Sequence, residues 1–150
     1  MPNENLLLSI QPEYATKIFN GTKKVELRRN RPRLKENAWV FVYVSTPVKA
    51  LVGAFQVDHI VEAAPHHLWR MVRNEAGLTR KQFAEYYEGA TRGYGIFLKE
   101  AKELSEPITL EDLREAWSGF HPPQIFRYLT ATELEMVKLR LHINGLSRTE

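Results

Sequence analysis

The residues best suited to chemistry in this chain stand in the stretch NGTKKVELRRNRPR, residues 20–33. From Lys17 to Lys35, one carboxylate, Glu26, stands among eight basic residues: Lys17, Lys23, Lys24, Arg28, Arg29, Arg31, Arg33 and Lys35. Lysine and arginine hold phosphate, arginine in a bidentate manner, and a carboxylate can accept hydrogen bonds from a base edge or act as a general base. The pattern indicates either an anionic-ligand site built on Lys23, Glu26 and Arg28, or a solvated strand edge whose ion pairs contribute about 0–1 kcal/mol.

Other residues could extend such a site. Aromatic rings stack on nucleobases for about 1–3 kcal/mol per base, and the first candidates are Tyr94, which two glycines flank, and Trp69, which precedes Arg70. Each ring could instead belong to the core. Ser45 ends an apolar strand, where its hydroxyl could meet a phosphate or a sugar, or simply cap a turn. Four further cations are candidate backbone contacts for a nucleic acid: Lys24, Arg29, Arg31 and Arg33.

Several kinds of chemistry are excluded or disfavoured by residue type and spacing. The chain has no cysteine, which excludes disulfides, thiolate nucleophiles and zinc–thiolate sites. The histidines show no His-x-x-x-His spacing: they are His59, His66, His67, His121 and His142. Neither a Gly-x-Ser-x-Gly elbow nor a phosphate-binding P-loop is present. We therefore expect no metal and no cofactor.

Length and composition indicate a single domain spanning residues 1–150, long enough for one core. The hydrophobic share of 43% is ordinary for a globular protein, and the net charge is only +3. More than a third of the 21 basic residues nevertheless fall between Lys17 and Lys35 inclusive, which is the footprint expected for a phosphate-bearing partner. The apolar run near the N-terminus is too short for a signal peptide or a membrane span, so we expect a cytoplasmic protein without membrane contact.

The order of elements predicts an α+β fold. Pro12 and Gly21 fit the start and stop of a first helix, and Gly53 fits a bulge or a close approach within a strand. Strands are expected at 5–10, 22–29, 39–46, 50–63, 91–107 and 121–129. Helices are expected at 65–77, at 80–90 after a Thr79 cap, at 109–120 with a Thr109 cap, and at 131–143 from a Thr132 to Glu135 capping box. Short, non-consecutive strands with helices between them suggest a small, mostly antiparallel barrel with helices packed around it.

The stretch LLSIQPEYATKIFNGTKKVELRR resembles the opening of ASCH domains, which belong to the PUA-like superfamily of β-barrels. Their signature, Gly-x-Lys-x-x-Glu-x-Arg, is intact here as Gly21, Lys23, Glu26 and Arg28. The stretches LWRMVRNEAGLTRKQFAEYYEG and PPQIFRYL resemble a subgroup of ASCH proteins labelled as transcriptional regulators. The likeness runs from about Leu6 to Leu129.

The resemblance implies a PUA-like barrel with a cleft that exposes the signature residues, and an association with RNA or modified nucleosides. One ASCH subgroup hydrolyses N4-acetylcytidine with a Lys, Thr and Glu triad. Its lysine matches Lys23, its threonine falls on Glu26, and its glutamate lies loosely near Glu75, so the missing threonine argues against that reaction. Other members are ribonucleases.

Two functions therefore stay open at this point. The first is a nucleic-acid-binding module, for RNA above all, with a basic cleft around Lys23 and Arg28. The second is a small hydrolase of RNA or of a modified nucleoside that uses Lys23 and Glu26 as catalytic groups. A regulatory interaction module is a third and weaker possibility, because no helix-turn-helix pattern stands out. The sequence does not indicate an oligomeric state.

Overall fold

The computed structural model describes residues 5–124 and 126–143, so residues 1–4 and 144–150 of the expected single domain, and the His142 side chain, lie outside the described part. Its sheet has six strands in the order β2-β5-β4-β3-β1-β6. Their bounds are Leu6–Ile10 for β1, Val25–Arg28 for β2, Trp39–Val44 for β3, Ala50–Ala63 for β4, Gly93–Thr109 for β5 and Phe126–Tyr128 for β6. Among the strand pairs of the described residues, only β1–β3 is parallel, so the predicted α+β class with a mostly antiparallel, barrel-like sheet is confirmed.

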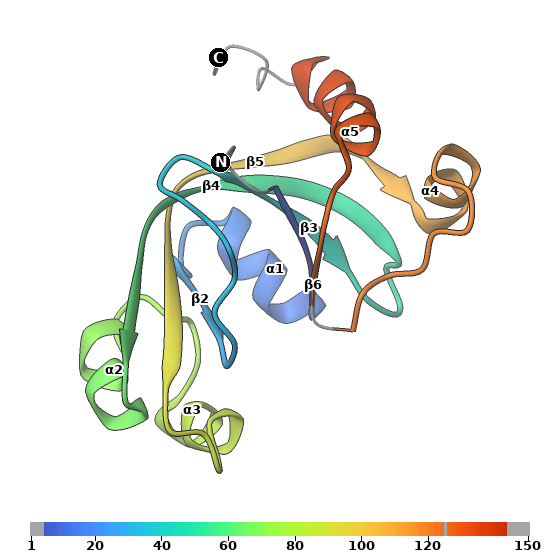
Figure 1. Cartoon of the computed structure of the whole chain (residues 1–150). Coiled ribbons are helices and arrows are strands. Elements are labelled where there is room, and N and C mark those ends of the chain that lie inside the picture. Colours follow the sequence, from blue (N-terminus) through green and yellow to red (C-terminus); the bar gives the residue numbers. More distant parts are fainter. Residues whose placement is uncertain (1–4, 125, 144–150) are drawn as a thin grey trace.

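The sheet curls into a half-barrel that stays open between its two end strands, β2 and β6 (Figure 1). Helix α1, Pro12–Phe19, lies between these two edges. It begins at Pro12, as predicted, and the chain leaves it through Gly21 with φ +88°, a conformation that glycine adopts without strain. At this open seam, between β2 and β6, the motif residues in β2 lie close to the end of β1.

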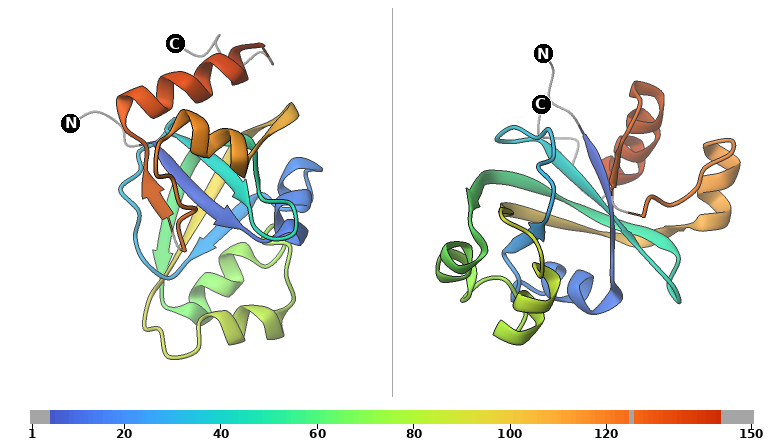
Figure 2. Two further views of the ribbon diagram at one scale, coloured as in Figure 1. Left: turned by 90° about the vertical axis from the view of Figure 1, so that its right-hand side faces the viewer. Right: turned by 60° about the horizontal axis from the view of Figure 1, so that its bottom comes forward.

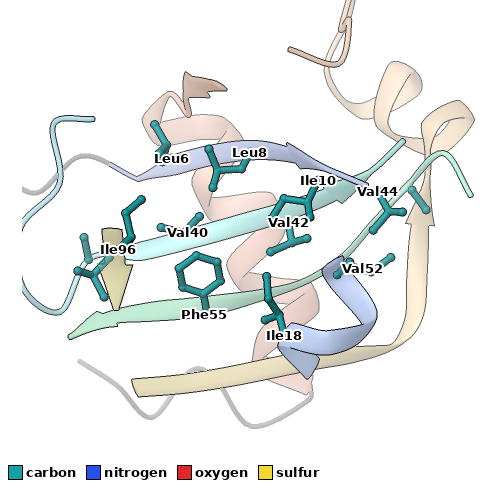
Figure 3. Packing of buried hydrophobic residues seen from close by; sticks show 14 residues of the cluster. Leu6, Leu8, Ile10, Ile18, Val40, Val42, Val44, Val52, Phe55 and Ile96 are labelled. Atoms are coloured by element: carbon teal, nitrogen blue, oxygen red, sulfur yellow. The ribbon is translucent and has the colours of Figure 1, made fainter. Parts of the chain in front are cut away.

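The core beneath the sheet is built by the alternation of apolar residues along β1, β3 and β4. Figure 3 shows Ile18 of α1 pointing toward Phe55 and Val52 of β4. A side-chain carbon on Gly53 would collide with the Phe19 ring and with the Lys102 carbonyl, so the close approach predicted at this glycine is confirmed.

The remaining helices lie at opposite ends of the sheet (Figure 2). Helices α2, Pro65–Val72, and α3, Arg80–Tyr86, pack on Val25 and Leu27 of β2 at one end, and α4, Leu110–Ala116, and α5, Ala131–Ile143, cover the other. No helix in the described part of the chain has the length and apolar character needed to cross a membrane.

Several predicted helix boundaries were wrong. The helices expected at 80–90 and 109–120 end at Tyr86 and Ala116. The helix expected to end at Gly77 ends at Val72, and an irregular loop that includes Gly77 leads to α3. The last helix is capped by Thr130 and Glu133 rather than by the predicted Thr132 and Glu135. Thr130 Oγ1 accepts from the Glu133 amide at 3.1 Å, and Glu133 Oε1 accepts from the Thr130 amide at 3.0 Å.

Candidate functional site

Two charged side chains are buried in the described part of the chain, and both belong to the signature motif. Lys23 is 3% exposed and Glu26 is 6% exposed. Strand β2 alternates as strands do: Val25 and Leu27 join the cluster under α2 and α3, and Glu26 and Arg28 line a cavity at the seam. Buried charges are costly unless they are paired, so their arrangement matters for both stability and chemistry.

The Glu26 carboxylate lies between two cations. Its Oε2 accepts a hydrogen bond from Arg28 Nη2 at 2.8 Å. Its Oε1 lies 3.9 Å from Lys23 Nζ, beyond hydrogen-bond distance, and takes no hydrogen bond from any other described residue. One carboxylate oxygen is therefore fixed, and the other keeps its lone pairs for a ligand.

The loop between α2 and α3 holds Lys23 in place. Lys23 Nζ donates to the Ala76 carbonyl at 2.5 Å, and the Lys24 amide donates to the Glu75 carbonyl at 2.7 Å. Gly77, with φ +74°, allows the loop to lie this close, since a side-chain carbon there would be 3.0 Å from Lys23 Cβ. Lys17 Nζ also holds the loop, by donating a 2.8 Å hydrogen bond to the Gly77 carbonyl.

Burial changes the acidity of the lysine. Desolvation lowers the pKa of Lys23 from its ordinary value, the negative charge of Glu26 partly opposes the shift, and the positive charges of Arg28 and Lys17 add to it. The Tyr14 ring, with its centroid 5.3 Å from Nζ, gives the ammonium a favourable face. A lysine with a lowered pKa gives up its proton more readily than an exposed one, which suits it to proton transfer.

These groups line a cavity of about 360 Å³ at the open seam of the half-barrel. It is walled by β1 and the start of α1 on one side, by β2 on the other, and by α3 and the segment before β6. Its lining residues are Ser9, Ile10, Gln11, Tyr14, Lys23, Glu26, Leu27, Arg28, Leu78, Gln82, Tyr86 and Gln124. Two hydrogen bonds hold the walls: Ser9 Oγ donates to the Pro123 carbonyl at 2.6 Å, and the Tyr86 hydroxyl donates to the Leu27 carbonyl at 3.2 Å.

The structure brings Lys23, Glu26 and Arg28 together and leaves the other predicted cations outside the cavity. Lys24, Arg29, Arg31 and Arg33 are all exposed. Arg29 donates to the Tyr86 carbonyl at 3.3 Å, Arg31 pairs with Glu62 at 3.3 Å, and Arg33 lies over the Tyr128 ring at 4.4 Å. Their role as backbone contacts stays a prediction.

The predicted aromatic candidates lie elsewhere. Tyr94 stands on β5 opposite Arg28, outside the cavity lining, with Arg31 5.9 Å from its ring centroid. The glycine before it makes room for the core rather than for a ligand, because a side-chain carbon on Gly93 would meet the Tyr87 ring. Trp69 lies in a separate cavity between α2 and α3.

Two further predicted residues are also absent from the lining of this cavity. Ser45 begins the turn after β3, where its carbonyl accepts from the Val48 amide at 3.1 Å. Glu75 contributes its backbone carbonyl to the loop over Lys23, and its side chain is half-buried. A ligand role for either side chain stays a prediction.

Sequence reasoning missed the polar wall groups Tyr14, Gln82 and Tyr86. Tyr14 reads as one more residue of an apolar helix face, and Gln82 completes the Thr79 capping box. The four-residue spacing of Gln82 and Tyr86 is the one signal that they share a helix face. The described residues contain no group of three or more His, Asp or Glu side chains arranged to hold a metal ion.

The comparison with protein families settles the relationship. The ASCH domain family matches residues 8–121. This chain belongs to the ASCH family. A Zymomonas mobilis protein named ASCH domain-containing ribonuclease is 32% identical over 129 residues, which cover 86% of each chain.

Solved structures agree with this assignment. The crystal structure of the Zymomonas mobilis ASCH protein superimposes with a TM-score of 0.85 at 32% identity, over 90% of this chain and 94% of that one. The N-terminal domain of Staphylothermus marinus McrB, at a TM-score of 0.58 and 11% identity, covers 91% of this chain and shares the fold alone.

Proposed function

We propose that this ASCH protein binds RNA and cleaves it in the cavity that contains Lys23. The observation that carries the proposal is the cluster of buried Lys23 and Glu26 with half-buried Arg28, in which two cations outnumber one carboxylate at the wall of a cavity. The net positive charge suits a phosphodiester, and the free Glu26 Oε1 suits a hydroxyl that must lose its proton. The similarity to a protein named a ribonuclease supports the choice of RNA.

The groups present can serve a transesterification within the RNA strand. Glu26 takes the proton of a ribose 2′-hydroxyl, whose oxygen attacks the adjacent phosphorus while the bond from phosphorus to the 5′-oxygen breaks. The Lys23 ammonium gives its proton to the departing 5′-oxygen, and Arg28 stabilises the charge on the phosphoryl oxygens. The products are a 2′,3′-cyclic phosphate and a 5′-hydroxyl, and proton exchange with solvent restores both side chains.

The exposed cations beside the cavity supply the affinity that does not depend on sequence. Lys24, Arg29, Arg31 and Arg33 stand on the same segment as the motif, where each could neutralise one phosphate. For a single strand, each such contact contributes about 0.7 to the slope of log K against log salt. Binding that weakens strongly between low and physiological salt is therefore expected.

The test is a cleavage assay on an end-labelled single-stranded RNA and on the same oligonucleotide with one 2′-deoxyribose. We expect product ends with cyclic phosphate from the RNA and protection at the deoxy position. Lys23→Met, which keeps the packed stem, and Glu26→Gln should lose cleavage, and Glu115→Gln on the exposed side of α4 should keep it.

Salt-dependent binding with the RNA recovered intact would contradict the cleavage step and leave a non-catalytic RNA-binding module. Preference for duplex DNA would favour the transcriptional-regulator hypothesis instead. Product at the deoxy position would contradict the attack by the 2′-hydroxyl. The cytoplasmic location expected from the sequence stays a prediction.

A further inference from the structure

A second cavity, of about 510 Å³, lies between α2 and α3 and shares no lining residue with the Lys23 cavity. Its floor is aromatic: the ring centroids of Trp69 and Phe83 are 5.0 Å apart, and those of Phe83 and Tyr87 are 4.7 Å apart. Phe83 and Tyr87 are buried, and Tyr87 is fixed by a 3.0 Å hydrogen bond from its hydroxyl to the Arg28 carbonyl. Trp69 is only half-buried, so its ring is the aromatic surface that a ligand can reach.

Three arginines line the same cavity. Arg70, Arg73 and Arg80 are all exposed. Within residues 5–124 and 126–143, their guanidinium groups take part in no ion pair or hydrogen bond. The cavity therefore combines an apolar, aromatic floor with positive charge that no neighbouring carboxylate balances. Guanidinium groups bind phosphate in a bidentate manner, and a half-exposed indole accepts a stacked base.

Helix α3 is the wall between the two cavities. Gln82 and Tyr86 face the Lys23 cavity, and Phe83 and Tyr87, one residue further along in each case, face the second cavity. An α-helix with its side chains is about 10–12 Å across, which about three to four nucleotides span at 3.4 Å per nucleotide. Arg29, bonded to the Tyr86 carbonyl at 3.3 Å, places another cation at the end of this helix.

We infer that the groove between α2 and α3, defined by Trp69, Phe83, Arg70, Arg73 and Arg80, is a second subsite for single-stranded RNA. A base of the strand stacks on Trp69, and the adjoining phosphates bind the arginines. The strand then crosses α3 and enters the Lys23 cavity. This inference rests on the proposed function, and it adds a minimum substrate length that the Lys23 cavity alone does not impose.

The test compares a trinucleotide, which fills one cavity, with a ten-nucleotide single strand, which reaches both. Binding of each is titrated at several salt concentrations with wild type, Arg70→Gln/Arg73→Gln, Trp69→Leu and the charge-matched control Lys49→Gln/Lys138→Gln. The control residues are exposed in the turn after β3 and in α5. Figure 1 shows α5 at the opposite end of the sheet from α2 and α3.

We expect the arginine variant to lower the salt slope for the ten-nucleotide strand by about 1.4, which is two contacts at about 0.7 each, and to leave trinucleotide binding unchanged. Trp69→Leu should weaken binding of the longer strand at least fivefold. In the wild type, the longer strand should quench tryptophan fluorescence, and Trp69→Phe should remove that quenching.

Equal binding of both strands by the arginine variant and the wild type would overturn the second subsite and leave the proposed function intact. Loss of trinucleotide binding in the same variant would also overturn the second subsite, because the arginine substitutions would then disturb the fold rather than weaken the binding of longer strands alone. Failure of the wild type to bind either RNA would remove both proposals together. An acidic peptide that binds the groove while RNA binding ignores the arginines would identify a protein partner instead.

Discussion

The buried carboxylate between Lys23 and Arg28 makes Glu26→Gln a sharp test of the site geometry. The substitution keeps the shape of the side chain and removes one negative charge from between two cations, at 3.9 Å and 2.8 Å. Removing one partner of a buried ion pair costs about 3–5 kcal/mol, because the remaining charge is left uncompensated. The amide oxygen of glutamine can still accept from Arg28, so we expect a loss near the lower end, about 3 kcal/mol.

The chain contains a matched control for this substitution. Glu62 also lies between two cations, Arg31 and Arg92, each at 3.3 Å, but its side chain is 38% exposed. Exposed ion pairs contribute about 0–1 kcal/mol, so Glu62→Gln should cost at most that much. The two sites differ mainly in burial, so the difference between the two losses measures how much burial adds to the free energy of the ion pair.

Urea and thermal unfolding of both variants measure the difference. For a domain of this size, 1 kcal/mol changes Tm by about 2–4 °C, so Glu26→Gln should lower Tm by about 6–12 °C and Glu62→Gln by no more than about 4 °C. A total stability of about 5–15 kcal/mol leaves the Glu26 variant folded at room temperature. Equal losses in the two variants would refute the claim that Glu26 is held in a desolvated pair.

Three further predictions follow from contacts around the site and at α5. Gly77→Ala should cost about 1–2 kcal/mol of stability because of the positive φ, and it should also lower RNA cleavage because the new methyl group displaces Lys23. The control Gly89→Ala, with φ +81° and open space around it, should lose stability alone. Burial lowers the pKa of Lys23 in the folded state, so between the folded pKa and the unfolded pKa of 10.5 the unfolded chain binds more protons than the folded one. The stability of wild type relative to Lys23→Met should therefore rise with pH across that range. Urea titrations at several pH values measure this difference, and a difference that does not change with pH would contradict the prediction. Burial alone would raise the pKa of Glu133, but hydrogen bonds from Arg127 and Thr130 outweigh burial and lower the pKa below 4.5. Glu133→Gln should therefore cost about 1 kcal/mol of stability at pH 7 and progressively less as the pH falls through the folded pKa. Urea midpoints at pH 7 and pH 3 measure this change.

Local sequence rules predicted much of the fold. The alternation typical of a strand holds in KVELR, with Val25 and Leu27 on one face, in the cluster under α2 and α3, and Glu26 and Arg28 on the other, lining the cavity. Thr79 and Thr109 cap the helices that they were predicted to cap. These features depend on neighbours within a few residues, which is the range over which sequence patterns act.

Tertiary contacts decided the rest. Two overlapping capping boxes begin at Thr130 and Thr132, and the contact that favours the first is the 2.7 Å pair between Arg127 and Glu133. Lys23 is buried because the Ala76 carbonyl, 53 residues away, covers it. No spacing in the sequence indicates that contact, or that α3 separates Trp69 from the Lys23 cavity.

The central claim is that Lys23 and Glu26 cleave RNA, and its most direct test is the rate of product formation from one labelled single-stranded RNA. The assay compares wild type, Lys23→Met and Glu26→Gln under conditions where circular dichroism shows all three to be folded. The account predicts cyclic-phosphate product with wild type and a loss of at least about a hundredfold in each variant, the low end for a general acid or base. Equal rates for the three proteins would contradict it and assign the buried cluster to stability alone.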